Sequence, residues 1–159
     1  LLVLRDGEYK GCDETIALFE SLNDAGIKTI LINQSRKIVN SKHSMFIRDG
    51  LPRHDFLQYV SSTRYFICLS KWEGLGLPNL EAFCLGAKVI STPIPSSLIL
   101  KEYFPDGVSL DTDVSDVIDL IHQDRLRNES ENSDFFNKQN KMWMDYVLKL
   151  ISSELKHAS

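Results

Sequence analysis

The segment YFICLSKWEGLGLPNLEAFCLGAKVIS, residues 65–91, carries the strongest indication of the fold. It begins with an apolar run, 65–69, in which aromatic and branched side chains predict a buried strand. A glycine-rich turn at 73–77 comes next, and the apolar residues beyond it recur at helical spacing up to Gly86. A second short apolar run, 88–91, predicts another strand. This order of strand, tight turn, helix and strand predicts a parallel βαβ unit.

The same alternation extends in both directions from this segment. Further strands are predicted at 1–4, 27–32, 45–47 and 108–110. Further helices are predicted from an N-cap at Asp13 to a stop at Gly26, from Pro52 through Val60, up to Tyr103 after a loop at 92–97, and from 114 to about 122. Such alternation predicts an α/β fold with a Rossmann-like, doubly wound parallel sheet and a central strand at 65–69. Ligands of such sheets bind beyond the carboxyl ends of the strands.

Size and composition indicate one ordinary globular domain. The 159 residues are 43% hydrophobic and 25% charged, and we expect a single domain over 1–159 that ends in an amphipathic helix at about 131–157. The net charge of −4 argues against a protein that coats nucleic acid. The three cysteines form no C-x-x-C pair, so neither a zinc site nor a disulfide framework is expected. No histidine has partners at metal-ligand spacing, so we expect no metal.

The start of the chain, its apolar runs and its cysteines indicate what precedes it and in which compartment it works. The chain opens without Met inside an apolar run, so we expect a preceding N-terminal part that is absent here. No apolar run approaches the roughly 20 residues that a membrane-spanning helix needs. Free cysteines fit a reducing cytosol.

The glycine-rich turn has the features of an anion site. Gly74 and Gly76 let the backbone turn tightly and approach a ligand, and the free amides at the start of the next helix point toward the same place. Such a helix N-terminus suits a phosphate group. Glu73 precedes the glycines, and Glu81 is expected in the first turn of the helix, where its two oxygens suit adjacent ribose hydroxyls. An alternative for Glu81 is a partner of the helix dipole.

The whole string Glu73-Gly74-Leu75-Gly76-Leu77-Pro78 through Glu81-Ala82 is more specific than its parts. It resembles the E-G-F-G-L-P-x-x-E-A segment of the retaining, GT-B-fold glycosyltransferases known as group 1 or glycogen-synthase-like. The E-x7-E pair of that family is reproduced as Glu73 and Glu81, while Leu75 replaces the usual aromatic residue. The G-x-L-P segment of the family is similar to residues 49–52, and the resemblance covers about residues 1–122.

A second motif lies at the start of the chain. Family members carry an Arg after the first strand and Lys-Gly five residues later, and this pattern is matched by Arg5 and Lys10-Gly11. As a glycosidic bond to a nucleoside diphosphate breaks, negative charge grows on the leaving phosphate, and fixed cations stabilise it. The resemblance therefore implies that Arg5 and Lys10 act with Glu73 in catalysis. The alternative for Arg5 and Lys10 is solvated surface charge beside neighbouring acidic residues.

The resemblance implies a complete assignment of the donor site. Gly74, Leu75, Gly76 and Leu77 would hold the diphosphate with the two cations, Glu81 the ribose, and Glu73 the sugar. The full enzyme would move a sugar, with retention and without metal or cofactor, from a nucleotide-sugar donor, UDP- or GDP-linked, to a glycan, lipid or protein acceptor. This chain would be the C-terminal, donor-binding half, and the absent N-terminal domain would hold the acceptor. We expect a role in polysaccharide or glycoconjugate biosynthesis, in the cytoplasm, at the inner face of a membrane through peripheral association.

Other readings of the sequence stay open. A GT-B-like sugar-nucleotide epimerase or phosphorylase would use a similar domain, and a non-catalytic nucleotide-binding module would keep the sheet without the chemistry. A receiver module is disfavoured because the strand ending at Leu69 delivers Ser70 and Lys71 rather than an aspartate. Trp72 and Trp143 are expected to pack in the core or at a domain interface rather than to stack on a base. Several side chains are weaker candidates for donor contacts, with surface or loop roles preferred: His54, Ser96 and Ser97.

Overall fold

The structure is a computed structural model that describes most of the chain. It covers residues 1–36, 39, 46–47 and 51–124, together with three isolated helical positions, Lys138, Lys141 and Asp145. The helix predicted at about 131–157, with Trp143 in it, lies outside the described residues apart from those three positions.

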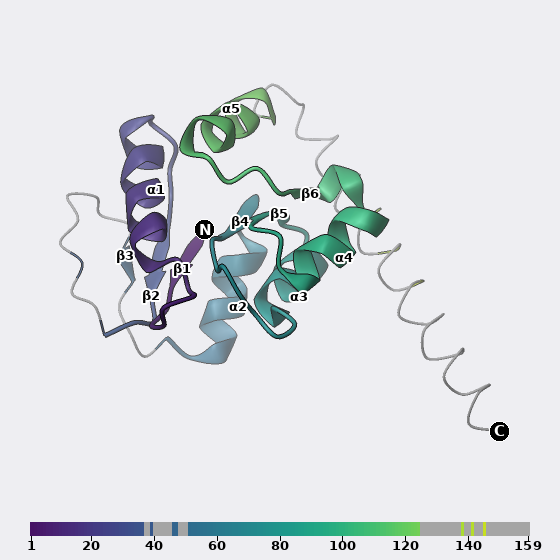
Figure 1. Ribbon diagram of the computed structural model, residues 1–159, viewed down its shortest axis with the longest axis horizontal. Helices are drawn as coiled ribbons and strands as arrows, with labels where there is room; N and C mark the ends of the chain where they lie inside the picture. Colours follow the sequence, from purple (N-terminus) through teal and green to yellow (C-terminus); the bar gives the residue numbers. More distant parts are fainter. Residues whose placement is uncertain are drawn as a thin grey trace.

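Six parallel strands form one sheet (Figure 1), with the order β3-β2-β1-β4-β5-β6. The strands are β1 (Leu2–Leu4), β2 (Leu31–Asn33), β3 (Phe46–Ile47), β4 (Tyr65–Cys68), β5 (Lys88–Ser91) and β6 (Val108–Ser109). Every pair of neighbouring strands runs parallel. The predicted doubly wound α/β fold is confirmed, and β4 lies in the centre of the sheet between β1 and β5.

Helices cover both faces of this sheet. They are α1 (Cys12–Asp24), α2 (Arg53–Ser61), α3 (Leu77–Cys84), α4 (Pro95–Tyr103) and α5 (Val114–Asp124), with a 3₁₀ turn at Pro105–Gly107. Buried side chains of α1 and α5 share one apolar cluster, and those of α2, α3 and α4 share the other. In Figure 1, α1 and α5 accordingly lie apart from the group formed by α2, α3 and α4.

Alternation along the central strand separates the two clusters. Tyr65 and Ile67 of β4 pack with α1 and α5, whereas Phe66 and Cys68 pack with α2, α3 and α4. Successive side chains of a strand point to opposite faces, so the sequence of a strand that is covered on both sides is a continuous apolar run. This is why the sequence at 65–69 identified the middle of the sheet.

Several predicted boundaries were wrong by a few residues. The strand predicted at 27–32 begins only at Leu31, because the Ile27 amide donates to the Leu22 carbonyl and closes the end of α1. Asp13 is not the N-cap of α1: Gly11 takes that position, in the left-handed conformation. The loop predicted at 92–97 is shorter, since α4 already begins at Pro95.

Candidate functional site

The candidate site lies where the order of the sheet reverses. The chain passes from β1 outward to β2 and β3, and then returns to place β4 on the other side of β1. The loops that leave β1 and β4 therefore flank a topological switch point, which is where open α/β sheets bind their ligands. Both sequence motifs fall on these loops, one at residues 5–11 and the other at 69–76.

The first loop places two cations at the carboxyl end of β1. Arg5 follows the strand directly, and the Lys10 amide donates to the Gly7 carbonyl at 3.1 Å, which closes a tight turn. Gly11 ends the loop at φ 62°, a conformation that glycine adopts without the strain of a side chain. A Cβ at Gly11 would lie 2.1 Å from the Leu69 carbonyl oxygen. The first loop thus runs against the end of β4.

The second loop packs against the start of α4 and is hydrogen-bonded to it. Gly76, the N-cap of α3, has φ 80°, and a Cβ there would lie 2.5 Å from Ser96 Oγ. The Ser96 amide donates to the Leu75 carbonyl at 3.0 Å, and the Thr92 hydroxyl donates to the Ser70 carbonyl. Ser96 is fully buried within α4, not in a plain loop as predicted. Gly74, in contrast, has open space around it.

Backbone and side-chain contacts join the two loops to each other. The Lys71 amide donates to the Tyr9 carbonyl at 2.7 Å, and Lys71 Nζ lies 2.6 Å from Glu14 Oε1 on α1. The close approach of Gly11 to the Leu69 carbonyl is a third contact between the two loops. The two motifs, about 60 residues apart in sequence, therefore form one structural unit.

Glu73 brings the predicted catalytic residues together. Its Oε2 lies 2.7 Å from Lys10 Nζ, and its Oε1 lies 3.7 Å from Arg5 Nη1. Burial raises the pKa of the Glu73 carboxyl, but the hydrogen bonds from Lys10 and Ser70 and the charges of Lys10 and Arg5 outweigh it, so this pKa lies below its ordinary value. Glu73 is 13% exposed and stays ionised at neutral pH. The cluster has two positive charges against one negative charge.

Glu81 occupies a separate position on α3. It is the fifth residue of that helix, in the second turn rather than in the predicted first turn, so the alternative role as a helix-dipole partner does not apply. Its Oε1 accepts a hydrogen bond from Arg53 Nη2, and this bond raises the pKa of the Arg53 guanidinium. Its Oε2 is buried and has no hydrogen-bond partner among the described residues. One acceptor of Glu81 is therefore left for a ligand.

Arg53 is the site residue that sequence reasoning missed. It is the first residue of α2, and its guanidinium carbon lies 5.8 Å from the centroid of the Phe56 ring. A cavity of about 220 Å³ opens beside it, lined by Arg5, Gln34, Leu51, Arg53, Phe56 and Pro78. The only local signal in the sequence is a cation directly after Pro52, and nothing there links it to a glutamate 28 residues further on.

Large apolar side chains border the site in an exposed position. Trp72, next to Glu73, is 66% exposed, so of its two predicted positions, the core and a domain interface, the core is excluded. Leu75 and Leu77 are 46% and 58% exposed. His54, on α2, has an exposed side chain, in agreement with the preferred surface role.

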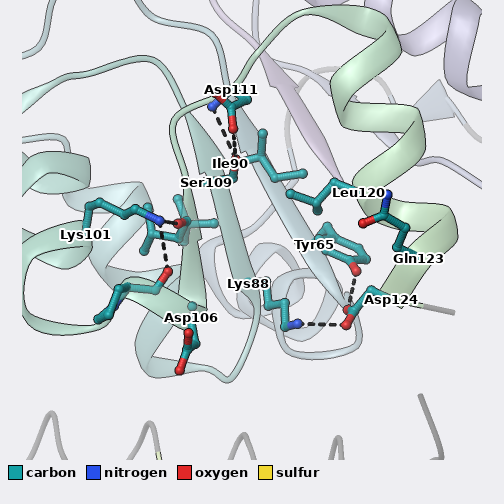
Figure 2. A pocket seen from close by; sticks show the side chains of 14 residues that line it. Tyr65, Lys88, Ile90, Lys101, Asp106, Ser109, Asp111, Leu120, Gln123 and Asp124 are labelled. Carbon is teal, nitrogen blue, oxygen red and sulfur yellow. Dashed lines mark hydrogen bonds and ion pairs between the residues drawn. The ribbon is translucent and has the colours of Figure 1, made fainter. Parts of the chain in front are cut away.

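A larger cavity, of about 360 Å³, lies against β5, β6 and the end of α5. Figure 2 shows it beside Tyr65 and Lys88, the first residues of β4 and β5. The Asp124 carboxylate accepts hydrogen bonds from the Tyr65 hydroxyl and, at 2.9 Å, from Lys88 Nζ, and Arg64 Nε lies 3.4 Å away. These contacts hold the end of α5 against β4 and β5.

The structure also bears on metals, cysteines and membranes. Among the described residues, no group of three or more His, Cys, Asp or Glu side chains could hold a metal ion. Cys12, Cys68 and Cys84 form no disulfide bond. In the part of the chain that the structure describes, no helix combines the length and the apolar character needed to cross a bilayer.

Comparison with known proteins adds a family match and a set of similar folds. The model of the family described as glycosyl transferases group 1 matches residues 1–132. Among curated proteins, none matches the sequence.

Three solved structures have similar folds. The trehalose-6-phosphate phosphatase N-terminal domain of Candida albicans has a TM-score of 0.66 at 14% identity, over 99% of this chain and 42% of its own. The alpha,alpha-trehalose 6-phosphate synthase of Burkholderia multivorans has a TM-score of 0.60 at 12% identity, over 99% of this chain and 43% of its own. A trehalose-6-phosphate protein of E. coli bound with UDP-2-fluoro glucose has a TM-score of 0.62 at 10% identity, over 98% of this chain and 43% of its own. This chain thus spans less than half the length of the structures that it matches.

Proposed function

The chain belongs to the group 1 glycosyl transferases, and from this membership we propose that it binds the nucleotide-sugar donor in a sugar-transfer reaction. The observation that carries the proposal is the union of the two loops at the switch point of the sheet. Arg5 and Lys10 lie there beside the loop that starts α3. Two cations next to a helix N-terminus form a site for a diphosphate.

The diphosphate would lie against the loop Gly74, Leu75, Gly76 and Leu77, with Arg5 and Lys10 as its counter-ions. Charge develops on the leaving phosphate as the bond to the sugar breaks, and cations already in place stabilise it without reorganisation. Glu73 holds both cations from the other side, at 2.7 Å from Lys10 and 3.7 Å from Arg5. This pairing fixes the position of long side chains that would otherwise lose conformational freedom on binding.

The two glutamates would divide the rest of the donor. The buried, unpartnered Oε2 of Glu81 would accept a ribose hydroxyl. Glu73, ionised and next to the phosphate site, would accept hydroxyls of the transferred sugar. Neither role needs a metal or a cofactor, since the positive charge comes from side chains.

The full-length protein would carry the acceptor on another domain. This chain covers 42% and 43% of the length of larger proteins with the same fold, which supports a further domain in the full-length protein. The E. coli relative is bound with a UDP-sugar, which supports a nucleotide-sugar donor here. Retention of anomeric configuration, a glycan, lipid or protein acceptor, and placement in the cytoplasm at the inner face of a membrane complete the proposal.

The test is calorimetric titration of the full-length protein with UDP, GDP, ADP and dTDP. We expect at least one nucleoside diphosphate to bind, and we expect Lys10→Ala to weaken that binding roughly tenfold or more, as the loss of a charged hydrogen bond of about 1.5–3 kcal/mol would do. The matched control is Lys28→Ala, an exposed cation near the amino end of β2, which should bind as the wild type does.

Two results would count against the proposal. Absence of binding by well-folded protein to all four nucleotides would reject a donor site. Equal losses for Lys10→Ala and Lys28→Ala would show that binding depends on overall charge and not on this loop. Transfer or hydrolysis of a bound donor separates a transferase from an epimerase, a phosphorylase or a plain binding module.

A further inference from the structure

Arg53 is held in a fixed orientation at the edge of the candidate site. Its side chain is 61% exposed, yet Nη2 donates to Glu81 Oε1 and the guanidinium lies over the Phe56 ring. A guanidinium has five N–H donors in one plane and no acceptor. Since the described contact with Glu81 uses one of these donors, the others remain for a ligand.

The cavity of about 220 Å³ next to Arg53 has the character of a site for a flat, acceptor-bearing group. Apolar walls come from Leu51, Phe56 and Pro78, and hydrogen-bond donors for a base come from Arg53 and Gln34. The remaining lining residue, Arg5, is the one that the proposed function places at the diphosphate. Among its described lining residues, none is a carboxylate. A ring with apolar faces and carbonyl oxygens on its edge would match both features.

The order of groups in a nucleotide places its base in this cavity. Base, ribose and diphosphate follow one another, so the base lies on the far side of the ribose from the phosphates. With the diphosphate at Lys10 and the ribose at Glu81, the residue beyond the ribose is Arg53, which contacts Glu81 directly. This step rests on the proposed function.

We propose that Arg53 selects nucleotide donors whose base carries a carbonyl at the position of guanine O6 or of uracil and thymine O4. Guanine offers O6 as an acceptor and uracil and thymine offer O4, whereas adenine and cytosine carry amino donors at these positions. Arginine donates only, so an amino group facing it leaves two donors in conflict. A well-placed pair of this kind discriminates between bases by roughly tenfold or more.

The experiment compares matched bases on the full-length protein. Affinities for GDP and ADP, and for UDP and CDP, are measured for the wild type, Arg53→Ala, Glu81→Gln and Lys28→Ala. We expect the wild type to favour GDP over ADP, or UDP over CDP, by about tenfold or more. In Arg53→Ala that preference should fall to within about threefold, because the residue that reads the base is gone.

Glu81→Gln distinguishes selection of the base from positioning of the ribose. It should weaken all four nucleotides and preserve the preference, since Arg53 remains, and Lys28→Ala should change neither. A wild type that binds nucleotides with no preference, or that prefers ADP or CDP, overturns the role of Arg53 and leaves the proposed function intact. So does a preference that survives Arg53→Ala. A wild type that binds no nucleotide rejects the proposed function itself.

Discussion

At the scale of single residues, three glycines differ in what an added side chain would meet: a strained backbone together with a steric clash, a strained backbone alone, or neither. Gly11 has a positive φ and lies against the Leu69 carbonyl, Gly26 has a positive φ but open space, and Gly74 has neither feature. Alanine should therefore reduce the free energy of unfolding by more than about 2 kcal/mol at Gly11, by about 1 kcal/mol at Gly26 and by less than about 0.5 kcal/mol at Gly74. Urea unfolding of the three variants measures this order, and a Gly11→Ala variant as stable as Gly74→Ala would contradict the contact.

Single residues also show which parts of the candidate site could be predicted from the sequence. Arg5, Lys10 and Glu73 were predicted as one functional group from their motifs, and the structure brings them together. Their roles toward a donor stay a prediction. Arg53 escaped prediction because its partner, Glu81, is 28 residues away, and only the tertiary fold brings the two charges into contact. Long-range pairs of this kind have no periodic signal in a sequence.

At the scale of secondary structure elements, Asp124 anchors the end of α5 to the sheet. The pKa of its carboxyl is raised by burial but is lowered further by hydrogen bonds from Tyr65 and Lys88 and by the charges of Lys88 and Arg64, so that it lies below the ordinary value. Asp124→Asn should therefore reduce the free energy of unfolding by about 1–3 kcal/mol at pH 7. The folded state keeps this carboxyl ionised to lower pH than the unfolded state, so the contribution is present above the unfolded pKa and is lost as pH falls through the folded pKa.

Denaturation of wild type and Asp124→Asn between pH 7 and pH 3 tests this anchor. The difference in stability should shrink steadily toward acid pH. Asp119→Asn is the matched control, because Asp119 lies on the same helix with an exposed side chain, and its effect should be small at every pH. A constant difference across the pH range would mean that the charge of Asp124 is not what stabilises the helix.

Element type was easier to predict than element ends. All six strands and five of the helices were expected from alternating apolar runs, because the strands β1, β2, β4 and β5 are covered on both faces and the helices bury one face. Boundaries shifted where tertiary hydrogen bonds decide them. The Ser96 amide, for example, donates to Leu75 across the site, and this bond helps to start α4 earlier than the Pro- and Ser-rich sequence indicated.

At the scale of the whole molecule, the candidate site opens onto exposed apolar side chains. Trp72, Leu75 and Leu77 border it, and an enclosed reaction would need another surface to cover them. We therefore expect residues 1–159 alone to bind a nucleoside diphosphate more weakly than the full-length protein and to transfer no sugar. Product formation from a nucleotide sugar, measured for both proteins at equal concentration, checks this. Appreciable transfer by the 159-residue chain would refute it.

The loops around Gly11 and Leu69 can change in evolution only in concert. A backbone-to-backbone contact leaves no room for an added side chain, and the hydrogen bond from Lys71 to Tyr9 sets the register of one loop against the other. An insertion in either loop alone would break both. Relatives that lengthen the segment after the first strand should therefore carry a compensating change after the fourth, whereas substitutions at open positions such as Gly74 can accumulate independently. We therefore expect the lengths of these two loops, more than their composition, to vary together among relatives.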